Sequence, residues 1–439
     1  MKKIFSFLFF AISLNSFGQS ETKFGKIDSL LNYLALNDKF MGSVAIQEND
    51  QIVFEKSYGF ADLKGKKKAN SKTKYKIGSV TKTFTAVVIM QLVEEKKITL
   101  ETKLSDFYPD IKNANKITIN NLLSHSSGIY SFTSDADYKT YALQPQTKSQ
   151  LLEKIKAGKV QFEPNSKAEY SNSNYVLLGW IIEDITKSSY QSNIENRIIK
   201  KIGLQNTGFS QSINSANNEA FSYHITGKNW EEASKEDMSI PGGAGSIIAS
   251  ASDLTQFITA LFSGKLLKQP SLESMATIEN GFGKGLFMMP FGERKFFGHT
   301  GGIENFSSTL GFYPKEKLAI ALLDNGQGGY GMNDVMIGIL SIYYKMPYRF
   351  PNVKTVDVAI STLKKYEGIY AAPNFPMKIS IKEESGVLIC QATGQESFPL
   401  NALSDTEFSF DPAGLKLVFV PDAMTILQGG QEFKLTKEK

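Results

Sequence analysis

Ser79 and Lys82 are the residues of this 439-residue chain whose types and spacing first indicate chemistry. They lie three positions apart in the stretch 77–95, where apolar side chains recur almost all round a helix, as in a helix at the centre of a domain. Side chains with this spacing share one face of the helix. A hydroxyl beside an amine at the positive end of a helix is a plausible activated nucleophile. Because Ser-x-x-Lys is common by chance, the rest of the chain must supply the other parts of a site.

Two further polar motifs follow later in the chain. Tyr170-Ser-Asn172 lies in a polar loop that enters a predicted helix, and His299-Thr300-Gly301-Gly302 lies at the end of a predicted strand. Each motif alone has a simpler structural reading, as a packed aromatic or a strand-end histidine, and Ser79 alone reads as a helix cap. Their order and their settings together favour a single shared site.

These three motifs resemble those of the serine β-lactamase-like hydrolases. That family includes class C β-lactamases, D-alanyl-D-alanine carboxypeptidases, D-aminopeptidases and related esterases, and some of its relatives carry the Ser-x-x-Lys element. The resemblance covers roughly residues 25–345, and it extends to the segments 121–128, 170–179 and 243–254. Such extended similarity is far more specific than any one tripeptide.

The resemblance implies acyl transfer through Ser79. A serine hydroxyl is inert until a base takes its proton. Lys82 can be that base only when it is neutral, which requires a pKa well below its reference value of about 10.4; burial and the helix dipole both act in that direction. By resemblance Tyr170 is a second proton carrier, so the sequence leaves two candidates for the formal base, Lys82 and Tyr170.

The remaining motif residues are expected to bind the substrate. Acyl transfer needs two backbone donors for the oxyanion, and by resemblance these are the amides of Ser79 and Gly302. Asn172 would orient the acyl-side amide of the substrate. The full set of substrate-binding positions is Asn172, His299, Thr300 and Gly301.

His299 is a departure from the β-lactamases, which usually carry lysine there. A neutral or partly charged imidazole binds a carboxylate less firmly than an ammonium does. We therefore expect an acyl-enzyme hydrolase that cleaves peptides containing D-amino acids. The alternatives are a broad esterase or weak β-lactamase, and, outside enzymes, a penicillin-binding cell-wall sensor without useful turnover.

Charge and composition limit the partners. The net charge of +5 includes Lys2 and Lys3, so the chain without its amino end carries about +3 (5 minus 2), and its lysines are scattered. We expect no nucleic-acid partner. Three histidines far apart in the chain predict neither a metal site nor a cofactor. The expected partner is a small peptide or ester, including fragments derived from peptidoglycan.

Residues 1–20 predict a secretory signal peptide. Two lysines precede a short apolar run and a small, polar cleavage zone near residues 18–20. The apolar run is too short to span a membrane, so we expect export to the periplasm or beyond, with no stable membrane span in the mature protein.

The predicted fold is α/β: an antiparallel sheet flanked by helices, with a helical subdomain that holds Tyr170. The sheet should combine residues 42–58 with 295–324 and place His299 on its edge strand. The hydrolase domain is expected over residues 21–345 and a linker over 346–360. Short alternating strands over 361–439 predict a small antiparallel barrel, whose first segment resembles a lipocalin-like domain.

Overall fold

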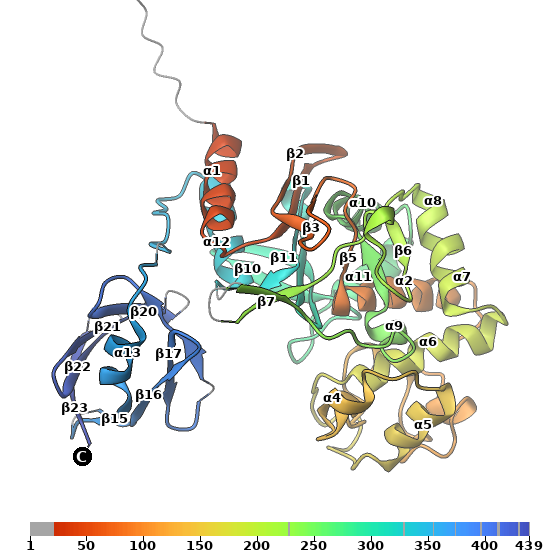
Figure 1. Cartoon of the computed structure of the whole chain (residues 1–439). Coiled ribbons are helices and arrows are strands. Elements are labelled where there is room, and N and C mark those ends of the chain that lie inside the picture. The colour runs from red at the N-terminus through yellow and green to blue at the C-terminus, as the bar shows by residue number, and fades with distance from the viewer. Residues whose placement is uncertain are drawn as a thin grey trace, which may run out of the picture.

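A computed structural model describes residues 22–438, apart from 227–228, 328–329, 354, 374, 396, 411–412 and 429–430 (Figure 1). The predicted signal peptide, residues 1–20, therefore lies outside the described residues. In the part of the chain that is described, no helix has the length and apolar character needed to cross a membrane.

The larger part of the chain is built on a six-stranded antiparallel sheet. Its strands lie in the order β10 (Phe287–Phe291), β11 (Arg294–Ile303), β12 (Phe306–Tyr313), β13 (Leu318–Asp324), β1 (Gly42–Glu48) and β2 (Gln51–Tyr58). The predicted union of residues 42–58 with 295–324 is confirmed, since β1 pairs with β13 along its whole length. Two segments far apart in the sequence thus form the middle of one sheet.

The expected position of His299 on an edge strand is wrong. His299 lies in β11, and β10 is the edge strand beyond it. However, β10 pairs with β11 only as far as Gly298. The half of β11 that carries His299 to Ile303 is therefore paired on one side by β12 and has no β10 partner on the other.

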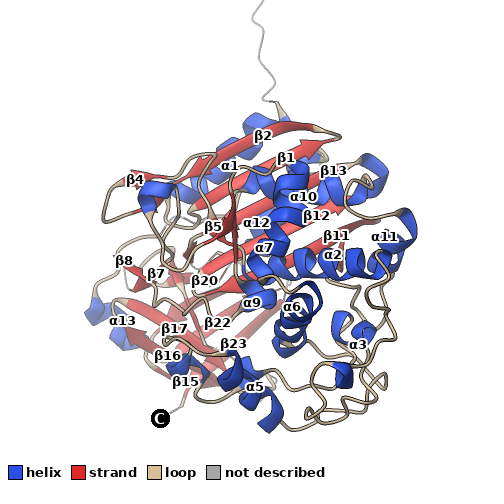
Figure 2. Ribbon diagram, turned by 90° about the vertical axis from the view of Figure 1, so that its right-hand side faces the viewer, coloured by secondary structure: helices blue, strands red, loops and turns tan. Residues whose placement is uncertain are grey.

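Helices cover both faces of the sheet, as Figure 2 shows for α10 lying across β1, β12 and β13. Alternate residues of β13 point to opposite faces. Ile320 packs with α1 (Lys23–Leu36) and α12 (Met332–Tyr343), while Ala321 packs with α2 (Thr81–Glu94) and α10 (Ala251–Phe262). Both faces are buried, which explains why β13 is apolar almost throughout.

A mostly helical region extends from one end of this sheet (Figure 1). Its helices are α3 (Ile119–Leu123), α4 (Tyr138–Tyr141), α5 (Lys148–Ala157), α6 (Asn172–Thr186), α7 (Tyr190–Ile194) and α8 (Lys200–Ile202). Helix α11 (Gln269–Ala276) packs on α2. Small sheets join the two regions: β5 (Tyr75–Lys76), β9 (Ile247–Ala249) and β6 (Thr207–Phe209) form one, and β14 (Gly326–Gln327), β7 (Tyr223–Thr226) and β8 (Asn229–Glu232) form another. The hairpin of β3 (Phe60–Asp62) and β4 (Lys67–Lys68) completes them.

The C-terminal strands form a separate antiparallel sheet with its own core, which includes Tyr370, Leu417 and Phe419. After α13 (Ile360–Tyr366) come β15 (Gly368–Ala371), β16 (Ile379–Glu384), β17 (Val387–Ala392), β18 (Phe398–Pro399), β19 (Asn401–Ala402), β20 (Glu407–Phe410), β21 (Leu415–Val420), β22 (Ala423–Gln428) and β23 (Gln431–Lys437). The consecutive strands β18 and β19 lie at opposite ends of the strand order, so the nine strands nearly close into a barrel. The predicted small β-barrel is confirmed.

Candidate active site

Ser79 lies on a sharp turn between a strand and a helix. It belongs to a 3-10 turn, η1 (Gly78–Val80), and α2 begins only at Thr81, so the expected helix start at residue 77 is too early. Gly78 has a φ of +48°, a left-handed conformation that favours glycine. This glycine redirects the chain from β5 into α2 and leaves Ser79 at the edge of a cavity.

Lys82 is completely buried on the first turn of α2, with 0% of its surface exposed. Its Nζ lies 2.9 Å from Ser79 Oγ, 2.8 Å from Asn172 Oδ1 and 2.8 Å from the carbonyl oxygen of Ala244. Burial holds the pKa of Lys82 well below its usual value, since the ammonium form loses its hydration. A neutral amine has two N–H donors for the two carbonyl oxygens and a lone pair that can accept the Ser79 proton.

Two elements hold the acceptors around Lys82. Asn172 is the first residue of α6, and its Nδ2 donates to Thr133 Oγ1 at 2.9 Å, which directs its Oδ1 toward Lys82. Ala244 lies in α9 (Gly242–Gly245), a single helical turn. The Ala244 carbonyl thus brings backbone into direct contact with Lys82.

Tyr170 closes the site from the segment before α6. It forms a hydrogen bond with the Ser79 side chain, and its ring centroid lies 4.9 Å from Lys82 Nζ. Burial raises the pKa of Tyr170, so the phenol is neutral near pH 7. His125 supports the ring at a centroid distance of 4.5 Å, and its Nδ1 accepts the Ser171 N–H at 3.1 Å. His125 thus has a structural hydrogen-bonding role.

His299 is packed behind Tyr170 and does not line the cavity. Only 1% of its surface is exposed, and its ring lies 4.3 Å from Phe287 and 6.2 Å from Tyr170 between centroids. Its Nδ1–H donates to the backbone oxygen of Thr300, which neighbours it. Burial and the nearby Lys82 lower the pKa of His299 to about 3, so the imidazole carries no charge near neutral pH.

Gly301 and Gly302 allow β11 to approach the Ser79 turn closely. A Cβ at position 301 would lie 2.1 Å from the Ile77 carbonyl oxygen and 3.0 Å from Ser79 N. Ser308 on the neighbouring strand donates to the same Ile77 oxygen at 2.8 Å. Ser79 and Gly302 both line the cavity, as the two expected oxyanion donors must.

The cavity beside Ser79 has a volume of about 180 Å³, room for several water molecules. Its lining combines predicted site residues with residues that sequence reasoning missed. The predicted ones are Ser79, Asn172 and Gly302, and the missed ones with polar side chains are Thr133, Tyr138 and Glu236. Nothing in the sequence singled out Glu236.

The fold and this arrangement agree with the family comparison. Residues 37–337 match the protein family described as Beta-lactamase, and the chain belongs to that family.

Three individual proteins are similar to this chain in sequence or in structure. The chain is 29% identical over 320 residues to protein flp of Staphylococcus aureus (strain MRSA252), which covers 70% of this chain and 63% of flp; the match thus spans less than two thirds of that relative. The structure is similar to that of a D-stereospecific amidohydrolase from Streptomyces sp., with a TM-score of 0.64 and 27% identity over 71% of this chain and 97% of the other. The octameric penicillin-binding protein homologue from Pyrococcus abyssi shares the fold over 94% of this chain and 98% of its own, with a TM-score of 0.67 and 23% identity.

Proposed function

We propose that this chain is an exported serine hydrolase that forms an acyl-enzyme on Ser79 and cleaves peptides containing D-amino acids. The contact of 2.9 Å between Lys82 Nζ and Ser79 Oγ carries the proposal, because a fully buried amine is the kind of base that a serine nucleophile needs. The similarity to a protein described as a D-stereospecific amidohydrolase supports the substrate class. Export rests on the predicted signal peptide.

In the proposed reaction, Ser79 Oγ attacks the carbonyl carbon and its proton passes to Lys82. The oxyanion of the tetrahedral intermediate accepts hydrogen bonds from the Ser79 and Gly302 amides. The proton returns through Lys82 or Tyr170 to the leaving nitrogen, and the C–N bond breaks. Water then attacks the ester of Ser79, which releases the acid and restores the hydroxyl.

Labelling with a fluorescent fluorophosphonate tests the nucleophile. We expect the wild type and Ser149→Ala, which changes an exposed serine on α5, to be labelled, and Ser79→Ala to remain unlabelled. Equal labelling of Ser79→Ala would refute the assignment.

Rates on D-alanyl peptides, nitrophenyl esters and a chromogenic cephalosporin then test the substrate class. The highest kcat/KM on a D-alanyl peptide is expected. Faster turnover of esters would favour the broad esterase. Stoichiometric acylation without turnover on every substrate would favour a penicillin-binding sensor.

A further inference from the structure

Glu236 places a carboxyl group in the wall of the same cavity as Ser79. It lies in the segment between β8 and α9 and is partly exposed. Tyr138, another lining residue, donates its hydroxyl proton to Glu236 Oε2 at 2.7 Å. This contact fixes one carboxylate oxygen, while no hydrogen bond to Oε1 is found among the described residues.

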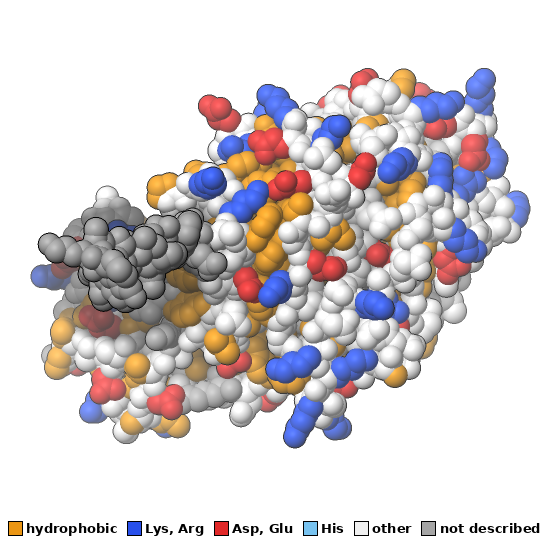
Figure 3. All heavy atoms as spheres, turned by 90° about the horizontal axis from the view of Figure 1, so that it is seen from above, with side chains coloured by type: hydrophobic (Ala, Val, Ile, Leu, Met, Phe, Trp, Pro, Cys, Tyr) orange, Lys and Arg blue, Asp and Glu red, His pale blue; other side chains and the backbone are white. Residues whose placement is uncertain are grey.

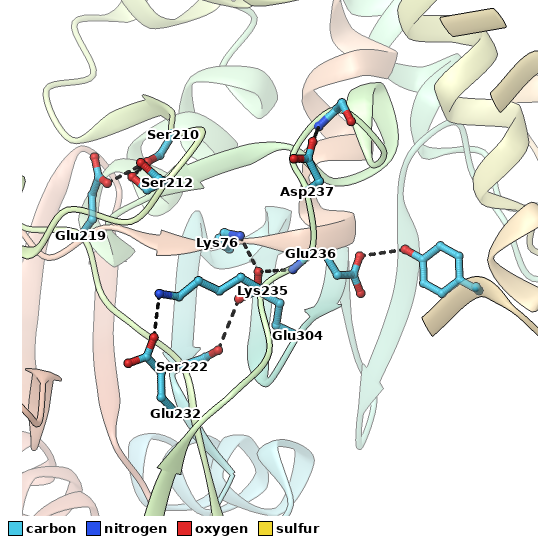
Figure 4. A network of polar contacts seen from close by, with 12 residues as sticks. Lys76, Ser210, Ser212, Glu219, Ser222, Glu232, Lys235, Glu236, Asp237 and Glu304 are labelled. Atoms are coloured by element: carbon cyan, nitrogen blue, oxygen red, sulfur yellow. Dashed lines mark hydrogen bonds and ion pairs between the residues drawn. The ribbon is translucent and has the colours of Figure 1, made fainter. Parts of the chain in front are cut away.

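A buried ion pair anchors the backbone that carries Glu236. Glu304 accepts from the backbone N–H of Glu236 at 3.0 Å and pairs with Lys76, and the side chains of Glu304 and Lys76 are only 2% and 3% exposed. Figure 4 shows Glu304 between Lys76 and this segment, with the Glu236 carboxyl turned away from Glu304 toward a tyrosine. The backbone position of Glu236 is therefore set by a contact outside the cavity, and its carboxylate is held by Tyr138.

The network leaves an excess negative charge at the cavity. The charges of Lys76 and Glu304 cancel because the two side chains form an ion pair. The three side chains Lys76, Glu304 and Glu236 therefore carry a net charge of −1 when Glu236 is ionised. Of the residues that line the cavity, Glu236 is the one with an ionisable acidic or basic side chain apart from tyrosine. Burial and the neighbouring Glu304 raise the pKa of Glu236, whereas the Tyr138 hydroxyl lowers it. A bound cation would relieve the cost of this partly desolvated carboxylate.

The cavity lies on the acyl side of Ser79. A leaving group must meet the proton carrier, and Tyr170 is not among the residues that line this cavity, whereas Asn172 and both expected oxyanion donors are. A group that fills the cavity therefore belongs to the part of the substrate that stays on Ser79.

From this geometry we infer that Glu236 is a specificity-determining residue that binds an ammonium group on the acyl part of the substrate. The enzyme would thus select aminoacyl groups with a free amine over acyl groups without one. This inference rests on the proposed acyl-enzyme function and adds to it the charge of the group that Ser79 accepts.

The test compares D-alanine p-nitroanilide with its N-acetylated form. The measured quantity is the ratio of their kcat/KM values, free amine over capped. We expect the wild type to prefer the free amine and Glu236→Gln, which keeps the size of the side chain and its acceptor for Tyr138, to lower the ratio about 10- to 100-fold, chiefly through KM. Asp237→Asn is the matched control: its carboxylate accepts from Ser239 N–H at 2.9 Å, and its substitution should leave the ratio unchanged.

The pH dependence adds a second readout. The wild-type ratio should fall as the pH drops and Glu236 becomes protonated, and the Glu236→Gln ratio should lack this fall. Equal losses on both substrates, an unchanged ratio in Glu236→Gln, or a wild type that prefers the capped substrate would each overturn the inference.

Fluorophosphonate labelling separates the two proposals. A wild type that is labelled at Ser79 yet shows no preference for the free amine would overturn only the role of Glu236. A wild type that is not labelled would overturn the acyl-enzyme itself. Labelled Glu236→Gln establishes that the variant is folded at the active site.

Discussion

Lys82 Nζ lies 2.8 Å from Asn172 Oδ1, although the two residues are 90 positions apart in the chain. Together with Ala244 O, Asn172 occupies two of the directions around the amine and leaves the third for Ser79. This contact joins α2 to the helical region, so the basicity of Lys82 depends on a residue from another part of the fold.

Replacing Asn172 by aspartate should shift the pH dependence of acylation. A carboxylate at this position would stabilise the ammonium form of Lys82 and raise its depressed pKa. In the proposed reaction the neutral amine takes the Ser79 proton, so fluorophosphonate labelling should slow toward low pH and recover at a higher pH than in the wild type.

Asn196→Asp is the control for this experiment. It places the same change beside the exposed Lys200, whose Nζ lies 2.8 Å from Asn196 Oδ1. This variant should keep the wild-type profile. A pH profile of Asn172→Asp that matches the wild type would mean that Lys82 is not the titrating base.

Tyr170→Phe should slow acylation without lowering the stability of the protein. The variant keeps the ring that packs on His125 and loses the hydroxyl that contacts Ser79, so labelling and turnover should fall by about 10²- to 10⁴-fold with little change in Tm.

Tyr175→Phe should show the opposite pattern. Its buried hydroxyl donates to Leu123 O at 2.8 Å, and its loss should cost about 1 kcal/mol of stability with labelling largely retained.

A Tyr170→Phe enzyme with wild-type rates would leave Lys82 as the sole proton carrier.

Gly301→Ala should disrupt the oxyanion site. The new Cβ would lie 2.1 Å from Ile77 O, so the turn that holds Ser79 must move away from β11. Loss of one well-placed donor costs about 10²- to 10³-fold in kcat, which steady-state rates would measure. Gly208→Ala, where a Cβ meets nothing within 4 Å, should behave as the wild type. Normal activity of Gly301→Ala would show that β11 and the turn need no close contact.

Asp324→Asn should stabilise the protein increasingly as the pH rises. Burial raises the pKa of Asp324 to about 8, so the folded state keeps a proton that the unfolded state releases above its ordinary pKa of 3.8. The stability that this proton contributes is complete below about pH 4 and is lost as the pH rises through 8. Asparagine keeps an acceptor for the Gly326 N–H, which now donates to Asp324 Oδ1 at 2.6 Å.

Thermal unfolding between pH 4 and 8 would measure this effect. The Tm of Asp324→Asn should rise relative to the wild-type Tm across this range. The corresponding gain in the free energy of unfolding is on the order of 1–3 kcal/mol. Asp422→Asn changes an exposed aspartate and should show no such trend. A constant difference between Asp324→Asn and wild type would contradict a titrating Asp324.

Charged side chains of both signs are interspersed on the face shown in Figure 3. This distribution agrees with the scattered lysines of the sequence. It suits a protein whose recognition depends on a cavity rather than on a broad surface of one charge.

Local pattern determined much of this protein. The apolar residues of 77–95 predicted a buried helix, because a helix that is apolar on all sides has no face suited to solvent. The segment 42–58 was likewise predicted to form strands, and β1 and β2 lie there. The three motifs also predicted which side chains share one site, since acyl transfer requires a nucleophile, a base and hydrogen-bond donors for the oxyanion.

Tertiary structure decided what those side chains touch. The spacing of apolar residues along the sequence predicts which residues are buried. The distances between Lys82, Asn172 and Ala244 depend instead on how α2, α6 and α9 pack. The same packing buries His299 behind Tyr170 and brings Glu236 into the cavity through a contact with Glu304. Long-range contacts of this kind leave no periodic trace in the sequence, because each is made by a single residue in an irregular or short segment.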